Sequence, residues 1–171
     1  MLEFHPLANL FPLIEGQAFA DLVADVMANG VLDKVVLLDG TILDGRNRYR
    51  AALEAGLDLG SAHVRANLFR IFDPAIEGDP LTWVLSKNLH RRHLDESQRS
   101  AVGAKLETLG HGGQRHGGTE QDASLQLTRS AVAGIVNVSP RSIASSKKVL
   151  NEGAPELFTA IERGQVKASV A

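Results

Sequence analysis

Two short runs of mostly β-branched and aliphatic residues, 34–38 and 41–44, flank the dipeptide Asp39-Gly40. Asp-Gly between two such runs is a strong signal for a tight β-hairpin, because both residues of this turn type adopt positive φ angles. A helix is predicted directly after the hairpin, over residues 46–55, and an amphipathic helix before it. A hairpin framed by helices indicates a domain of the α/β (α+β) class.

The remaining elements are predicted from apolar periodicity and from capping residues. The segment that starts at Asp95 carries Gln98 three residues later, which is a capping-box pattern, and it is predicted to be helical as far as Gly110. Asp79-Pro80 supplies an N-cap and a first-turn proline for another helix. The further predicted elements are a helix over 17–29, a strand over 63–72, helices over 80–87 and 95–110, and three helices over 124–136, 139–151 and 155–163.

A glycine-rich polar segment, 111–123, separates two parts of the chain that differ in their predicted structure. It has no apolar periodicity, so we predict a flexible hinge there. Residues 1–110 then form the α/β domain and residues 124–171 an all-helical domain. An apolar pattern still runs through Val166 and Val170 at the end of the chain, so we expect a truncated or short variant of a longer protein.

Composition limits the classes of function. The chain has 171 residues, 44% of them apolar, and a net charge of −2, so binding of a polyanion requires local clusters of basic residues. The absence of cysteine excludes disulfides and thiolate chemistry. No apolar run approaches the roughly 18 residues of a membrane span, and the N-terminus has no pattern of a signal peptide. We expect a cytoplasmic protein that does not bind membranes.

The first basic cluster is the sequence DGRNRYR, which spans residues 44–50. It begins the helix after the hairpin, where backbone N–H groups without intrahelical partners and the helix dipole attract anions. We predict that a phosphate-bearing ligand binds here, although an arginine-rich helix face in water is the common alternative. The candidate residues are Gly45, Arg46, Asn47, Arg48 and Arg50.

The second basic cluster lies just before the helix that starts at Asp95, and the two clusters could face one ligand. His90 and His93 have a spacing that suits a metal site, but a third ligand at a suitable spacing is missing, and a solvated turn is the other alternative. The candidate ligand-binding residues in this cluster are Asn88, His90, Arg91 and Arg92.

Residues 129–150 have the pattern of a helix-turn-helix. Val132 and the small Ala133 lie on the first helix, Asn137-Val138-Ser139 forms the turn, and Ile143 lies on the second helix, which would enter the major groove of DNA. A plain pair of core helices is the alternative. Arginine can read a base edge, whereas lysine mostly contacts phosphate. The candidate DNA contacts are Arg129, Ser139, Arg141, Ser142, Ser145, Ser146, Lys147 and Lys148.

These stretches, in this order, resemble the ParB family, whose N-terminal fold is shared with sulfiredoxin. The family motif G-E-R-R-x-R-A, which cradles the triphosphate of CTP, is matched at Gly45, Arg48, Arg50 and Ala51. The later motif E-N-x-x-R is matched at Asn88 and Arg91, with Lys87 in place of the acid. The resemblance covers nearly the whole chain and implies an N-terminal nucleotide-binding domain with a small mixed sheet, followed by a DNA-binding domain.

The resemblance also implies a function. Family members use CTP as a switch that closes a homodimer into a clamp on double-stranded DNA, in partition or transcriptional control, sometimes with a partner ATPase and with weak CTP hydrolysis. Asn88 would then help to hold Mg²⁺, whereas the ammonium of Lys87 would repel the cation. Two alternatives remain: a phosphotransferase or nuclease that uses Asp44 or His90 as acid or base, and a repressor that has lost nucleotide binding.

Overall fold

The computed structural model describes residues 1–89, 94–112 and 127–168. The chain divides into two structural units, unit 1 (Met1–Asn88) and unit 2 (Leu89–Ala171). Both units are rich in helices, and a small sheet lies in unit 1. Within these described ranges, no helix is long and apolar enough to cross a membrane.

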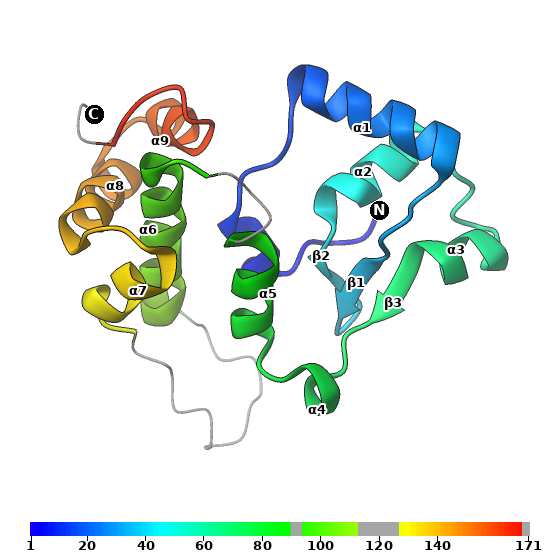
Figure 1. The fold of residues 1–171 in the computed structure, drawn as a ribbon, viewed down its shortest axis with the longest axis horizontal. Coiled ribbons are helices and arrows are strands. Elements are labelled where there is room, and N and C mark those ends of the chain that lie inside the picture. Colours follow the sequence, from blue (N-terminus) through cyan, green and yellow to red (C-terminus); the bar gives the residue numbers. More distant parts are fainter. Residues whose placement is uncertain (90–93, 113–126, 169–171) are drawn as a thin grey trace. The chain divides into compact units, whose positions relative to one another are not determined.

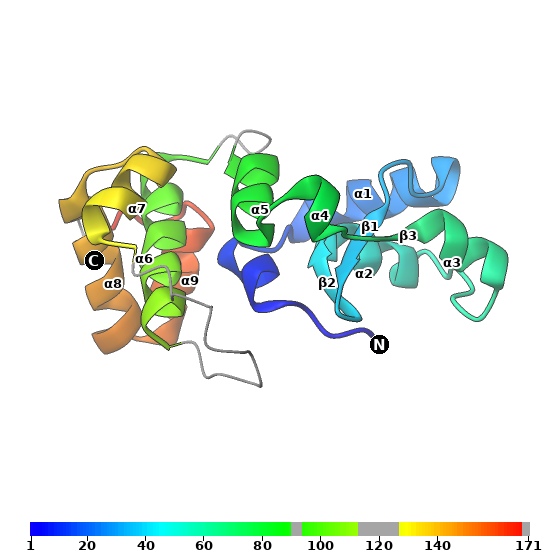
Figure 2. The same ribbon diagram turned by 90° about the horizontal axis from the view of Figure 1, so that it is seen from below.

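Unit 1 combines a three-stranded mixed sheet with helices (Figure 1). Its elements are η1 (Pro6–Leu10), α1 (Gly16–Asn29), β1 (Val35–Leu38), β2 (Thr41–Asp44), α2 (Arg46–Glu54), α3 (Ala62–Leu68), β3 (Phe69–Ile71), α4 (Pro74–Glu77) and α5 (Pro80–Leu89). The strand order is β2-β1-β3, with β1 antiparallel to β2 and parallel to β3. Helix α1 packs on α2, and Figures 1 and 2 both place η1 beside α5.

The predicted hairpin is confirmed. Asp39 and Gly40 join β1 to β2 with φ angles of 48° and 78°, the left-handed conformation that an Asp-Gly turn favours. The pairing of β1 with β2 shifts between Val36 and Leu37, which is a β-bulge. The hairpin therefore delivers Asp44, at the end of β2, directly to the start of α2.

The strand predicted over residues 63–72 is only partly correct. Residues 62–68 form α3, and the strand β3 covers residues 69–71 alone. Because β2 is antiparallel to β1, it ends where β1 starts, and the connection that contains α2 and α3 carries the chain to the opposite side of β1, where β3 begins parallel to β1. Within α3 only Leu68 is buried, so the segment has no apolar periodicity that would have revealed the helix.

The N-terminal segment before α1 is attached to the edge of the sheet. The backbone N–H of His5 donates to the carbonyl of Ile42 at 3.0 Å, and the N–H of Ile42 donates to the carbonyl of Glu3 at 2.9 Å. The hydroxyl of Tyr49, which is 1% exposed, accepts a hydrogen bond from the N–H of Leu2 at 2.8 Å. These bonds cover one edge of the sheet and fix the path of the chain toward η1.

Unit 2 consists of helices packed around a central one (Figure 2). Its elements are α6 (Glu96–Gly112), α7 (Arg129–Val136), α8 (Pro140–Glu152) and α9 (Pro155–Glu162), and α6 packs against the other three. The predicted capping box is present: Oδ1 of Asp95 accepts from the N–H of Gln98 at 2.8 Å, and Oε1 of Gln98 accepts from the N–H of Asp95 at 3.0 Å.

The boundary between the units differs from the predicted one. The glycine-rich segment indicated a boundary after residue 110, but the contacts divide the chain after Asn88, and α6 belongs to unit 2. The reason is packing: Ala101 on α6 lies in one apolar cluster with Val149, Phe158 and Ile161 from α8 and α9. Residues 113–123 of the predicted hinge lie outside the described residues.

Candidate functional site

The first turn of α2 begins at Gly45, which has a left-handed conformation with φ of 92° and ψ of 23°. A Cβ atom at this position would lie 3.0 Å from Nη2 of Arg48 and 3.2 Å from Cα of Val35. Glycine is therefore required here by its positive φ and by the close approach of the Arg48 guanidinium. The Arg48 guanidinium thus lies against Gly45, the position at which the sequence predicted the close approach of a ligand.

Three of the predicted phosphate ligands bind the N-terminal segment instead. Arg46, which is 9% exposed, donates to Oδ1 of Asn9 at 2.6 Å and to the carbonyl of Phe11. Oδ1 of Asn47 accepts a hydrogen bond from the N–H of Ile14 at 3.0 Å, and Nη1 of Arg50 donates to the carbonyl of Ile14 at 3.1 Å.

Aromatic rings add to this attachment. The guanidinium of Arg46 lies 5.6 Å from the ring centroid of Phe4, and that of Arg50 lies 4.3 Å from the ring centroid of Phe19. The side chains of Arg46, Asn47 and Arg50 thus hold residues 4–19 against α2. Of the predicted phosphate ligands on this helix, Arg48 is the one that points elsewhere.

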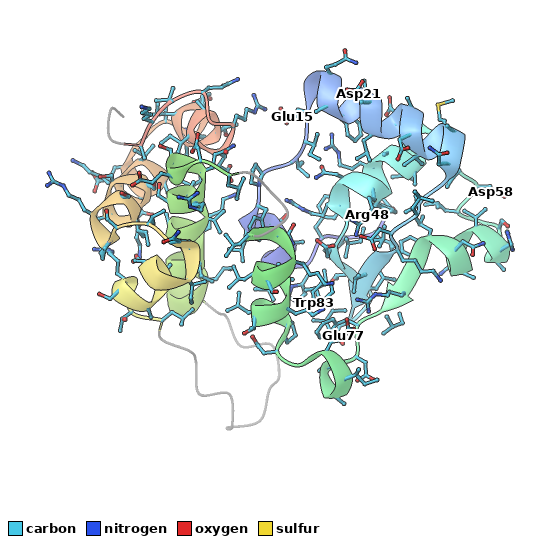
Figure 3. The ribbon with its side chains drawn as sticks, in the orientation of Figure 1. Glu15, Asp21, Arg48, Asp58, Glu77 and Trp83 are labelled. Atoms are coloured by element: carbon cyan, nitrogen blue, oxygen red, sulfur yellow. The ribbon has the colours of Figure 1, made fainter. Side chains whose placement is uncertain are left out.

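Arg48 and Asn88 share the carboxylate of Asp44, which links one residue of the first basic cluster to one residue of the second. Nη2 of Arg48 donates to Oδ2 of Asp44 at 3.0 Å, and Nδ2 of Asn88, on the last turn of α5, donates to Oδ1 of Asp44 at 3.1 Å. Arg48, which is labelled in Figure 3, also lies 3.5 Å from Oδ2 of Asp33 and donates to the carbonyl of Lys34 at 3.2 Å. Two motif residues that are distant in sequence therefore meet within unit 1.

Nε of Arg48 is buried and has no hydrogen-bond partner among the described residues. An unpaired N–H of a buried guanidinium costs free energy, so an acceptor placed against it would be bound favourably. Asn88 itself is 9% exposed, and its amide also donates to the carbonyl of Val84 at 3.0 Å. The pair Arg48 and Asn88 is the part of the predicted pocket that these contacts define.

The rest of the second cluster is only partly described. His90, Arg91 and Arg92 lie outside the described residues. Lys87 is exposed, and its ammonium lies 5.6 Å from the ring centroid of Trp83. Arg70 lies 5.4 Å from the same ring and binds Glu77 through two hydrogen bonds of 2.7 Å. Trp83 and Glu77 are labelled in Figure 3. The Arg70 hydrogen bonds keep the pKa of Glu77 below its ordinary value.

The fit of these residues to a magnesium triphosphate is partial. Arg48 and Asn88 provide donors for phosphate oxygens, while Arg46, Asn47 and Arg50 already donate to or accept from the chain itself. Asp44 is the carboxylate beside Asn88, and both of its oxygens accept hydrogen bonds. Within the described part of the chain, no group of three or more His, Asp or Glu residues is placed to hold a metal ion.

Helices α7 and α8 are joined by Asn137, Val138 and Ser139. Asn137 ends α7 with φ of 53° and ψ of 57°, and Oγ of Ser139 caps α8 by accepting from the N–H of Ser142 at 3.0 Å. Ile143 is fully buried, against Gly103 of α6. The two helices and the turn lie where the sequence predicted them, except that α7 begins at Arg129, after its N-cap Thr128.

Several predicted DNA contacts have structural roles in unit 2. Ser146 is fully buried, and its hydroxyl lies 2.6 Å from that of Ser100 on α6. Nζ of Lys147 and Nε of Arg129 each lie 2.7 Å from the carboxylate of Glu107, which is 3% exposed. Burial opposes ionisation of Glu107, but the hydrogen bonds from the two cations outweigh it and lower its pKa.

The outer face of α8 carries the remaining candidates. Arg141 and Lys148 are exposed, Ser145 is half-buried, and within the described residues neither of the two cations forms an ion pair. Ser142 donates a hydrogen bond to Oε1 of Glu96 at 3.0 Å. Arg141, Ser145 and Lys148 are therefore the predicted residues whose side chains remain available to DNA.

Glu107 and Glu96 did not emerge from the sequence as functional candidates. For Glu107 a signal existed, because it follows the buried residues Ser100, Gly103 and Ala104 at helical spacing, which places a carboxylate on the buried face of α6. A carboxylate there requires cationic partners. For Glu96 the sequence held no such signal, since its contact with Ser142 depends on how α6 and α8 pack.

The described residues define a helix-rich α/β protein with a small mixed sheet. No family model matches the chain, and neither does any curated protein. Among solved structures, the chain is similar to the C-terminally truncated chromosome-partitioning protein ParB from Caulobacter crescentus, crystallised in complex with CTP-γ-S. The two chains are 18% identical, the match covers 99% of this chain and 84% of that one, and the TM-score is 0.36.

Proposed function

We propose that this protein is a ParB-like DNA-binding protein of DNA partition or transcriptional control, in which CTP switches a homodimer into a clamp on double-stranded DNA. The proposal that the protein binds DNA rests on helix α8, which has one face packed in the core and one face exposed. Its inner face packs through Ile143, Ser146 and Val149, while Arg141 and Lys148 lie on the outside without an ion-pair partner among the described residues. A helix of this kind suits the major groove.

The charge distribution favours unit 2 as the part that binds DNA. Unit 1 contains 7 Lys and Arg against 12 Asp and Glu, whereas unit 2 contains 11 against 8. A positive excess attracts the phosphate backbone, and a negative excess repels it. The net charge of −2 for the whole chain therefore hides an asymmetry that favours DNA binding through unit 2.

The CTP-binding part of the proposal depends on Arg48 and Asn88. Both belong to motif positions that the ParB resemblance assigns to the triphosphate, and both donate to Asp44. Arg48 retains a buried Nε without a partner among the described residues, and this N–H would bind a phosphate oxygen at the start of α2. The helix N-terminus adds backbone donors.

A specific observation supports a second candidate function, a DNA-binding repressor without a nucleotide switch. Arg46, Asn47 and Arg50, which would contact the triphosphate in the first proposal, are hydrogen-bonded to Asn9, Phe11 and Ile14. Nucleotide binding through all three would require the N-terminal segment to leave α2. In the repressor, these residues hold the segment permanently.

Titration calorimetry of the full chain with each of the four nucleoside triphosphates, with and without Mg²⁺, tests the proposal. Tight binding of CTP alone, lost in Arg48→Ala, supports the switch, and the same variant should still bind DNA because Arg48 lies outside unit 2. Absence of nucleotide binding together with retained DNA binding supports the repressor. A chain that binds neither nucleotide nor DNA contradicts both.

A further inference from the structure

We propose that Glu96 determines part of the DNA sequence preference, by accepting a hydrogen bond from the N4 amino group of a cytosine in the major groove. This inference rests on the proposed DNA-binding function of α8 and adds a residue from α6 to its contact surface. The partner is therefore double-stranded DNA with a C·G base pair at a defined position.

The position of the Glu96 carboxylate is fixed by α8. Glu96 is the first residue of α6, and its side chain is exposed. Oγ of Ser142 donates to Oε1 of Glu96 at 3.0 Å, and the hydroxyl of Ser139 lies 2.8 Å from that of Ser142. Ser139 is the N-cap of α8, so this chain of hydrogen bonds holds the carboxylate beside the first turn of the helix.

The residues next to this carboxylate are those that would approach base edges. In helix-turn-helix proteins, the N-terminal residues of the second helix contact the bases. Exposed Arg141 is the second residue of α8, and Ser142 follows it. Oε1 of Glu96 is therefore held beside the first turn of α8, which carries Arg141. The second oxygen of the Glu96 carboxylate remains available to a donor.

Glu96 also differs from the other carboxylates of unit 2 that contact neighbouring helices. Glu107 binds Arg129 and Lys147, and Glu162 binds Lys105. In the described ranges, by contrast, no lysine or arginine forms an ion pair with Glu96. Among the described residues its hydrogen bond comes from a neutral hydroxyl, so no cation of that part of the chain compensates the negative charge of the carboxylate.

A carboxylate without a cationic partner at a DNA interface affects both the affinity for DNA and the preference for particular bases. It repels phosphate and therefore lowers affinity for all sequences, and it accepts hydrogen bonds without donating any. In the major groove only cytosine N4 and adenine N6 offer amino donors, and adenine presents its N7 acceptor beside N6, which repels a carboxylate. Glu96 should accordingly favour cytosine.

Selection from a pool of double-stranded DNA with a randomised region tests this inference, with the full chain as wild type and as Glu96→Gln. The glutamine keeps an acceptor for Ser142 but loses the charge and gains a donor. We expect the motif selected by the wild type to contain a C·G pair. At that position the preference of Glu96→Gln for C·G over the other base pairs should be about fivefold to tenfold weaker, while the affinity of the variant for unrelated DNA should rise.

The matched control is Glu152→Gln, which removes the same charge from the last turn of α8 and should leave the motif unchanged. Ser142→Ala keeps the Glu96 carboxylate but removes the hydrogen bond that holds it beside α8, so this variant should weaken the same base preference. An identical motif for wild type and Glu96→Gln would overturn the inference and leave DNA binding by α8 intact. A wild-type chain that retains no DNA would overturn the proposed function as well.

Discussion

Nδ2 of Asn88 donates a hydrogen bond to Oδ1 of Asp44 at 3.1 Å, although the two residues are 44 positions apart in the sequence. The other oxygen of the same carboxylate accepts from Arg48. Asp44 therefore positions the two motif residues, one on α2 and one on α5, that the sequence predicted to bind one ligand. Their mutual position depends on a residue that the ligand itself would repel.

Replacement of Asp44 by alanine should destabilise unit 1. Asn88 and Arg48 would each lose an acceptor in a partly buried position, so we expect the free energy of unfolding to fall by about 1–3 kcal/mol. Urea titration followed by fluorescence measures this, because Trp83 on α5 is the single tryptophan of the chain. Asp33→Ala, whose side chain is 58% exposed, is the control and should cost less than about 1 kcal/mol. Equal effects of the two variants would contradict the role of Asp44.

Arg46→Ala should release the N-terminal segment from α2. The variant removes the hydrogen bonds that Arg46 donates to Oδ1 of Asn9 and to the carbonyl of Phe11, and we expect a loss of about 2–3 kcal/mol in the free energy of unfolding. Hydrogen exchange measured by mass spectrometry should show faster exchange in residues 5–14. The control is Arg65→Ala, an exposed position on α3, and should change neither quantity. Unchanged exchange in Arg46→Ala would show that the segment is held by other contacts.

Local signals in the sequence were sufficient for the hairpin, the capping box of α6 and the turn between α7 and α8, because each depends on residues within four positions of one another. The direction in which each basic side chain points, and the groups that it contacts, depend instead on residues that are distant in the sequence. Arg46 and Arg48 are two residues apart on α2, yet one contacts Phe11 and the other contacts Asp44. Which arginine faces a ligand is decided by this packing.

The same reasoning explains the boundary between the units. Glycines at 112–113 and 117–118 predicted a division there, since composition indicates where a chain lacks apolar periodicity. It does not indicate with which neighbours a preceding helix packs. Helix α6 joins unit 2 because its small residues, such as Ala101 and Gly103, fit against α8 and α9.

Acidification should destabilise unit 2 through Glu107. Its pKa is lowered in the folded state, so the stabilisation is fully present above the ordinary pKa of a glutamate and is lost as the pH falls through the lowered value. Thermal unfolding followed by far-UV circular dichroism from about pH 7 to about pH 3 should show a falling melting temperature. Glu107→Gln should melt lower at neutral pH and depend less on pH. The same pH dependence in both proteins would mean that other carboxylates dominate.

Two glycines in helix interiors provide a matched pair of substitutions within unit 2. Gly134 on α7 is exposed, and a Cβ atom there would meet no other atom within 4 Å, so Gly134→Ala should stabilise the protein by about 0.5–1 kcal/mol through helix propensity. Gly103 on α6 is buried, and its Cβ would lie 3.0 Å from Cδ1 of Ile143 and 3.2 Å from Cγ2 of Val136.

Gly103→Ala gains the same propensity but must displace side chains from α7 and α8, which costs about 1–3 kcal/mol in a well-packed core. We therefore expect it to be less stable than Gly134→Ala by about 1–3 kcal/mol, measured by urea unfolding of the two variants under the same conditions. Because Ile143 supports the inner face of α8, Gly103→Ala should also weaken DNA binding, whereas Gly134→Ala should not. Equal stabilisation by both substitutions would show that α6 and α8 do not pack as closely as Gly103 and Ile143 indicate.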